Sequence, residues 1–141
     1  MLFRDAEESV LPCCLENSIG VIPHSVLAKA LLSGRYQPGH QFSTNDERSS
    51  RGEFEYETFE RVVDVTKRLS DWSADHGRDL VQLAIAWTLA HPAVTSSIVG
   101  AKSPEQVHHN AKAADWELTQ QDLKEIEEIQ GDLRLTDTKG W

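Results

Sequence analysis

The feature that most constrains the fold is a pair of short runs that read as strands, separated by a long stretch with helical periodicity. The runs are residues 19–22 and 95–99, and both are rich in β-branched side chains, which favour strands. Strands that are separated by helices pair in parallel within one sheet. We therefore expect an α/β protein with about two parallel strands and flanking helices.

Helical signals account for much of the chain between and after these runs. Apolar residues recur at helical spacing over residues 59–72, and Gly77 ends this helix. Asp79 is the expected N-cap of the next helix. Thr119 and Asp122 predict a capping box for the last helix.

The expected elements do not add up to a closed fold. Two strands of about five residues cannot form a barrel, and a parallel pair leaves its edges uncovered. Residues 37–52 are rich in polar residues and glycine, which predicts a mobile surface loop. We expect a partial domain over residues 1–130, followed by a C-terminal tail at 131–141.

The segment after the second run has the signature of an anion site. Ser103 is the expected N-cap, Pro104 suits the first helical position, and Gln106 completes a capping box. Lys102 precedes the unpaired N–H groups of this helix start, so dipole, donors and a cation converge as in a phosphate site. An ordinary capped turn with an exposed lysine explains the same residues equally well.

The net charge and the cysteine content exclude some classes of function. The 141 residues carry a net charge of −9, which disfavours binding to nucleic acid or to an anionic membrane surface. The apolar runs are far shorter than the roughly 20 residues of a membrane span, and the N-terminus lacks a signal-peptide pattern. Cys13 and Cys14 are adjacent, which suits reduced thiols and predicts a cytoplasmic protein.

Two other kinds of site have weaker support. His108 and His109 have no third ligand at helical spacing, so we expect a solvated helix surface and no metal site. His24, Ser25 and Asp64 lack the nucleophile elbow of a hydrolase triad. Neither pattern predicts catalysis.

Three segments carry family-specific motifs in a consistent order. They are GVIPHSVLAKALLSGRY at residues 20–36, LAIAW at 83–87 and IVGAKSPEQVHHN at 98–110. With these segments the chain resembles the aldo-keto reductase family from residue 2 to about residue 130. The resemblance implies a (β/α)₈ TIM barrel that transfers a hydride between NADPH and a carbonyl compound. This chain corresponds to the C-terminal portion of that barrel, beginning just after the sixth strand.

The resemblance implies a cofactor-binding part without the reaction centre. The family's catalytic Asp, Tyr, Lys and His lie on earlier strands, so no catalytic residue is assigned and the chain alone is expected to be inactive. A cation near the 2′-phosphate position favours NADP over NAD. The implied cofactor-binding residues are His24, Ser25, Val26, Leu27, Ala28, Arg35, Gly100, Lys102, Gln106, His109 and Asn110.

Three positions depart from the family pattern. His24 stands where an aromatic ring usually stacks on the nicotinamide, Val26 replaces a proline, and Ala30 replaces a glycine. A second hypothesis is therefore a non-catalytic fragment that self-associates or pairs with a complementing chain, because a partial barrel exposes faces that normally pack inward.

Overall fold

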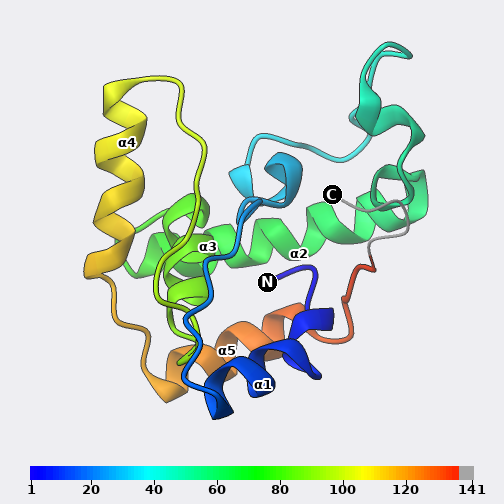
Figure 1. Cartoon of the computed structure of the whole chain (residues 1–141). Coiled ribbons are helices and arrows are strands. Elements are labelled where there is room, and N and C mark those ends of the chain that lie inside the picture. The colour runs from blue at the N-terminus through cyan, green and yellow to red at the C-terminus, as the bar shows by residue number, and fades with distance from the viewer. Residues whose placement is uncertain (137–141) are drawn as a thin grey trace.

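The computed structural model describes residues 1–136, and its regular structure is helical (Figure 1). The α-helices are α1 (Val10–Glu16), α2 (Tyr56–Asp75), α3 (Leu80–Leu89), α4 (Pro104–Ala111) and α5 (Gln120–Gln130). Short 3₁₀ helices are η1 (Asp5–Glu7), η2 (Ala28–Ser33), η3 (Glu47–Ser50), η4 (Gly52–Phe54) and η5 (Lys112–Asp115).

The predicted strands at residues 19–22 and 95–99 are wrong as strands. Within residues 1–136, pairing is limited to two isolated parallel bridges, Val21 with Val94 and Phe3 with Leu135. Val21 N–H donates to Ala93 O at 2.9 Å, and Thr95 N–H donates to Val21 O at 3.0 Å. The parallel direction was predicted, but a pair without further neighbours does not extend into a ladder.

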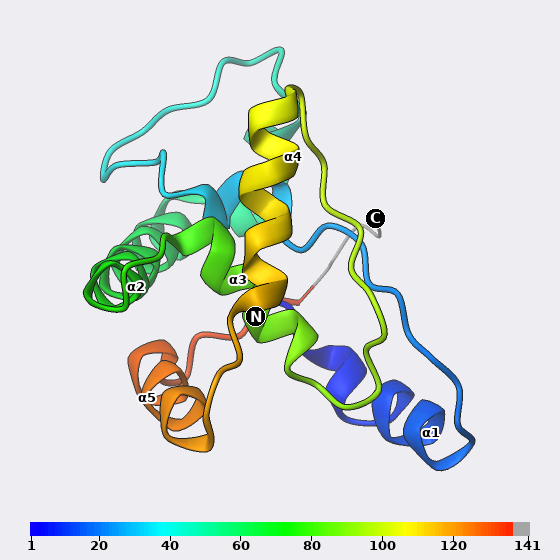
Figure 2. The ribbon, with the colours of Figure 1, turned by 90° about the vertical axis from the view of Figure 1, so that its left-hand side faces the viewer.

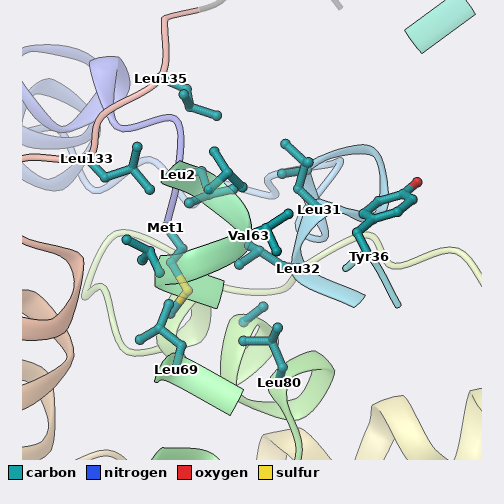
Figure 3. Close-up of a cluster of buried hydrophobic side chains, with 14 of the residues drawn as sticks. Met1, Leu2, Leu31, Leu32, Tyr36, Val63, Leu69, Leu80, Leu133 and Leu135 are labelled. Atoms are coloured by element: carbon teal, nitrogen blue, oxygen red, sulfur yellow. The ribbon is translucent and has the colours of Figure 1, made fainter. Parts of the chain in front are cut away.

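The core forms where helices pack on helices. α2 buries Phe59, Val62, Val63 and Leu69 on one face, as the spacing of its apolar residues predicts. α3 is apolar on nearly all sides and packs against α2, α4, η2 and η5. Figure 3 shows how side chains from distant parts of the sequence meet in this core. Its buried apolar members include Met1, Leu2, Leu31, Leu32, Leu80, Leu83, Ile126, Leu133 and Leu135.

Local capping signals are confirmed at the predicted helix starts. Asp79 accepts a hydrogen bond from Gln82 N–H at 2.9 Å, and Thr119 and Asp122 form a reciprocal capping box. Ser103 caps α4 through Gln106 N–H at 3.3 Å. These contacts involve residues three apart, so sequence alone specifies them.

The loop over residues 37–52 is more structured than its composition predicts. Phe42 lies within an aromatic cluster, with its ring centroid 5.4 Å from Tyr36, 5.0 Å from Phe54 and 5.6 Å from Phe59. Burying such rings offsets the ordering entropy that a polar loop would otherwise retain.

Helix α1 stands apart from the body of the molecule (Figure 2) and contains no buried residue. Val10 and Leu15 on this helix are exposed. None of the helices within residues 1–136 combines the length and the apolar character that crossing a bilayer requires.

Candidate functional site

The candidate site begins where the two extended segments end side by side. Ile98 N–H donates to Pro23 O at 2.9 Å, beyond the bridge between Val21 and Val94. Because the extended segments at residues 21–23 and 94–98 run in the same direction, their carboxyl ends lie side by side at one edge of the pair. Ligand sites of parallel α/β folds lie at this edge.

The segment after Pro23 has an unusual backbone. Ser25 has φ of 54°, and three consecutive residues, Ala28, Lys29 and Ala30, have φ of 47°, 52° and 73°. Non-glycine residues rarely adopt this left-handed region, since Cβ approaches the following carbonyl. The N–H of Ala28 donates to Ser25 O at 2.7 Å, so a backbone hydrogen bond closes this turn.

Buried charge pairing holds this turn in place. Glu53 has only 5% of its side chain exposed, and its Oε1 lies 3.5 Å from Lys29 Nζ and 3.3 Å from Arg51 Nε. A buried carboxylate requires partners of opposite charge. The strained turn is therefore fastened to the loop that precedes α2.

Arg35 follows the left-handed turn closely in the sequence. Its guanidinium carbon is 5.2 Å from the ring centroid of Tyr36, a cation–π contact. The Tyr36 hydroxyl accepts a hydrogen bond from Arg48 at 2.6 Å, and Arg48 pairs with Asp46 through two bonds of 2.7 and 2.5 Å. Hydrogen bonds from Arg48 lower the pKa of Asp46 to about 2. This network keeps the exposed Arg35 close to the body of the protein.

The start of α4 is capped, with one difference from the prediction. The Gln106 side chain accepts from Lys102 N–H at 2.7 Å, rather than from the N-cap Ser103. Ser103 also hydrogen-bonds the Glu105 carboxylate, and this bond lowers the pKa of Glu105. A carboxylate thus already lies on the helix N-terminus where a phosphate is expected.

The other predicted residues of α4 divide into two groups. Asn110 Nδ2 lies 3.5 Å from Gly100 O, so Asn110 joins the segment that leads into the helix. His109 instead pairs with Asp79, with Nε2 and Oδ2 2.7 Å apart, and its carbonyl accepts from Gln82 at 3.1 Å. His109 therefore faces the start of α3, away from Lys102 at the start of α4.

A cavity of about 650 Å³ lies between α1, the end of α3 and residues 21–26. Its lining includes His24, Ser25, Val26 and Ala28 of the predicted residues. The predicted residues of α4 and its leading segment are absent from that lining, so the cavity reaches one part of the candidate site. Its wall is mainly apolar.

Neighbouring side chains bring charge to the rim of this cavity. His24 Nδ1 and Ser25 Oγ are 2.8 Å apart. Arg4 lies 5.3 Å from the ring of Trp87 and pairs with Glu7 and Glu127. The hydrogen bonds that Arg4 donates to Glu7 raise the pKa of Arg4.

Sequence reasoning missed Glu53, Asp79 as a partner of His109, and Glu105. Glu53 has one partner nearby in sequence, Arg51, but its other partner, Lys29, is 24 residues away. Glu105 did carry one, since an acidic side chain in the first helical turn favours the helix dipole. Within residues 1–136 no group of three or more His, Cys, Asp or Glu side chains is arranged to hold a metal ion.

Comparisons with known proteins show the family of the chain. Residues 1–130 match the profile of the Aldo/keto reductase family. Aldo-keto reductase YhdN of Bacillus subtilis is 28% identical over 127 residues, which are 89% of this chain and 38% of that protein. The NADH-specific methylglyoxal reductase of Escherichia coli is 30% identical over 133 residues, which are 92% of this chain and 39% of that relative.

A solved structure shows the same fold over part of its length. The glycerol dehydrogenase AKR11B4 from Gluconobacter oxydans matches with a TM-score of 0.84 at 22% identity, over 96% of this chain and 42% of that one. This likeness supports the expected part of a (β/α)₈ barrel. The chain belongs to the Aldo/keto reductase family, and it spans about two fifths of the length of the curated relatives that it matches.

Proposed function

We propose that this chain is the NADP(H)-binding portion of an aldo-keto reductase that reduces aldehydes or ketones. The observation that carries the proposal is the hydrogen bond from Ile98 to Pro23, which brings the carboxyl ends of the two segments to one edge. Both segments then continue into residues that suit an anion. When bound, the cofactor supplies the hydride.

The residues at this edge fit an anionic cofactor. Lys102 is exposed beside the start of α4, and its charge adds to the dipole of the helix. Arg35, which follows the left-handed turn at residues 28–30 in sequence, adds a second exposed cation. The proposed set also includes His24, Ser25, Val26, Leu27, Gly100, Gln106, His109 and Asn110.

In this proposal the chain binds the cofactor but contains no reaction centre. No residue is assigned as the proton donor, and general-acid catalysis contributes about 10²–10⁴-fold. We therefore expect no aldehyde reduction by the chain alone. The two free thiols, Cys13 and Cys14, support a reducing compartment such as the cytoplasm.

Calorimetric titration with NADP⁺ and with NAD⁺ tests the proposal. We expect Lys102→Ala to weaken NADP⁺ binding by about 1–3 kcal/mol and NAD⁺ binding less, because the 2′-phosphate loses a charge-assisted hydrogen bond. Lys124→Ala is the matched control, since Lys124 lies on α5 in an exposed pair with Glu128. Equal weakening of both cofactors would assign the selectivity to other residues, as in a relative named for NADH specificity.

A second candidate function is a non-catalytic fragment that self-associates or completes a partner. Ile19, Ile22 and Ile98 are exposed beside the isolated bridge. Apolar side chains gathered at an open edge favour association. Light scattering at increasing concentration tests this candidate, and a strictly monomeric chain would exclude self-association.

A further inference from the structure

Polar contacts at the C-terminal end of α4 attach this helix to the rest of the molecule. None of the residues of α4, which lies wholly within the described part of the chain, is buried, and Val107 is 56% exposed. Apolar packing therefore contributes little to the direction of α4. Figure 1 shows the start of α4 standing away from the other helices, whereas its C-terminal end lies nearer to them.

Two side chains at the start of α3 hold His109 from two directions. The Gln82 side chain donates to His109 O at 3.1 Å, and Asp79 Oδ2 lies 2.7 Å from His109 Nε2. Gln82 is 5% exposed, so its amide needs a protein partner for the bond that water would otherwise provide. Asp79 uses its other carboxylate oxygen, Oδ1, to cap α3 through Gln82 N–H at 2.9 Å. We name these three residues the α3–α4 clamp.

The residue next to the clamp continues the connection toward the proposed phosphate site. Asn110 Nδ2 lies 3.5 Å from Gly100 O, in the segment that leads through Lys102 into α4. Lys102 N–H in turn donates to the Gln106 side chain at 2.7 Å. Of the neighbours His109 and Asn110, one contacts the start of α3 and the other contacts this leading segment. Hydrogen bonds and one short helix thus connect the start of α3 with Lys102.

We propose that Asp79 and Gln82 are positioning residues for the cofactor phosphate, and that they act through His109 by fixing the direction of α4. The inference rests on the proposed NADP(H)-binding function, and it adds residues that lie outside the motif at residues 98–110. His109 then serves the site through its bonds to the clamp, without touching the cofactor. When the clamp is lost, a smaller fraction of molecules holds Lys102 in the binding position, and the apparent affinity falls with that fraction.

A double-mutant cycle with calorimetric NADP⁺ titration tests the clamp. Asp79→Ser keeps an N-cap oxygen for α3 but has no second oxygen to face His109, and His109→Ala removes the ring itself. We expect each variant to weaken NADP⁺ binding by about two- to tenfold, and the double variant to weaken it no more than either single variant. His109→Gln keeps an N–H donor toward Asp79, so it should bind NADP⁺ within about twofold of the unaltered chain.

Asp71→Ala is the matched control for the cycle. Asp71 also forms an exposed ion pair, with Lys67 at 2.7 Å on α2, and its loss should leave NADP⁺ affinity unchanged. The proposal is overturned if Asp79→Ser binds NADP⁺ as tightly as the unaltered chain, or if the two single effects multiply in the double variant. It is also overturned if His109→Gln binds as weakly as His109→Ala. Weakening by His109→Ala alone would mean that His109 contacts the cofactor directly.

Amide exchange in α4 separates failure of the clamp from failure of the cofactor proposal. Val107 N–H donates to Ser103 O at 3.2 Å in the first turn of α4. We expect this N–H to exchange at least about threefold faster in Asp79→Ser and in Gln82→Met, which keeps the side-chain length but removes the donor. Exchange at the unaltered rate in both variants would overturn the clamp. If the unaltered chain does not bind NADP⁺, the proposed function fails and the phosphate role with it, while the exchange rates still decide whether the clamp fixes α4.

Discussion

The pair of helices α2 and α3 differs from the pair α1 and α4 in how many of its residues are buried. α2 and α3 together hold most of the fully buried side chains, whereas α1 and α4 contain no buried residue. Val10 of α1 and Val107 of α4 are exposed. Helices that pack on one another complete their core within this chain. Helices α1 and α4 adjoin the extended segments in sequence, and pairing of these segments within residues 1–136 is limited to isolated bridges.

The largest expected difference between these regions is in core stability. Leu69→Ala in α2 should lower the free energy of unfolding by about 2–5 kcal/mol, because Leu69 is fully buried and leaves a cavity. Leu15→Ala in α1 should cost under about 1 kcal/mol, since Leu15 is half exposed. Urea unfolding measures both, and similar losses would show that α1 packs as tightly as α2.

The buried N-terminus should make stability depend on pH. Burial lowers the pKa of the Met1 amine from 8.0 to about 5, so between these values the unfolded chain binds more protons than the folded chain. Stability should therefore rise from pH 5 to pH 8, by up to about 4 kcal/mol, and the penalty is fully present below pH 5.

An acetylated N-terminus provides the control for this pH dependence. Acetylation removes the titrating amine and leaves every side chain of the protein unchanged. The difference between the two urea-unfolding profiles isolates Met1. Two parallel profiles would mean that the amine stays solvated, and residues 1–3 would then be less tightly covered than the packing of Leu133 and Leu135 indicates.

Substitution of alanine by glycine should raise the stability of the protein where the backbone is left-handed and lower it where the backbone is helical. Ala30→Gly should stabilise the protein by about 0.5–1.5 kcal/mol, because it relieves a φ of 73°. Ala74→Gly in the helical backbone of α2 should destabilise it by about 0.5–1 kcal/mol. Thermal unfolding of both variants provides the comparison. Destabilisation by both would show that Ala30 contributes more by packing than it costs in strain.

The sequence predicted the parts of this molecule that depend on neighbours along the chain. Asp79, Ser103 and Thr119 cap their helices through residues three positions ahead, and the apolar spacing of α2 predicted its buried face. Strand formation is different, because it depends on pairing between distant segments, and within residues 1–136 this pairing is limited to the isolated bridges at Val21 and Phe3.

In the candidate site, too, the sequence predicted contacts between near neighbours and missed contacts between distant residues. Pairing along one helix start was predictable, whereas the contact between Lys29 and Glu53 spans 24 residues and depends on how the loop folds back. His109 was assigned to the cofactor with Lys102 and Asn110 because all three follow one motif. In the structure its ring turns to Asp79 of α3, so a shared motif did not ensure a shared direction.

The smallest expected effect concerns the competition at the start of α4. Glu105 is bonded to Ser103, and this bond lowers its pKa, so the side chain is charged at neutral pH and repels a phosphate at the same N-terminus. We expect Glu105→Gln to tighten NADP⁺ binding by about two- to fivefold, the range of a single charge at a helix end.

Glu117→Gln is the matched control for this charge, because Glu117 is exposed in the segment between η5 and α5. It makes the same change in net charge away from the start of α4, so it should leave NADP⁺ affinity unchanged. Calorimetric titration at two salt concentrations distinguishes a local effect of the charge from an effect of the net charge. Salt screens long-range charge interactions much more strongly than short-range ones. If both variants tighten binding equally, the gain comes from the overall negative charge of the chain, and the start of α4 is then not where the phosphate binds.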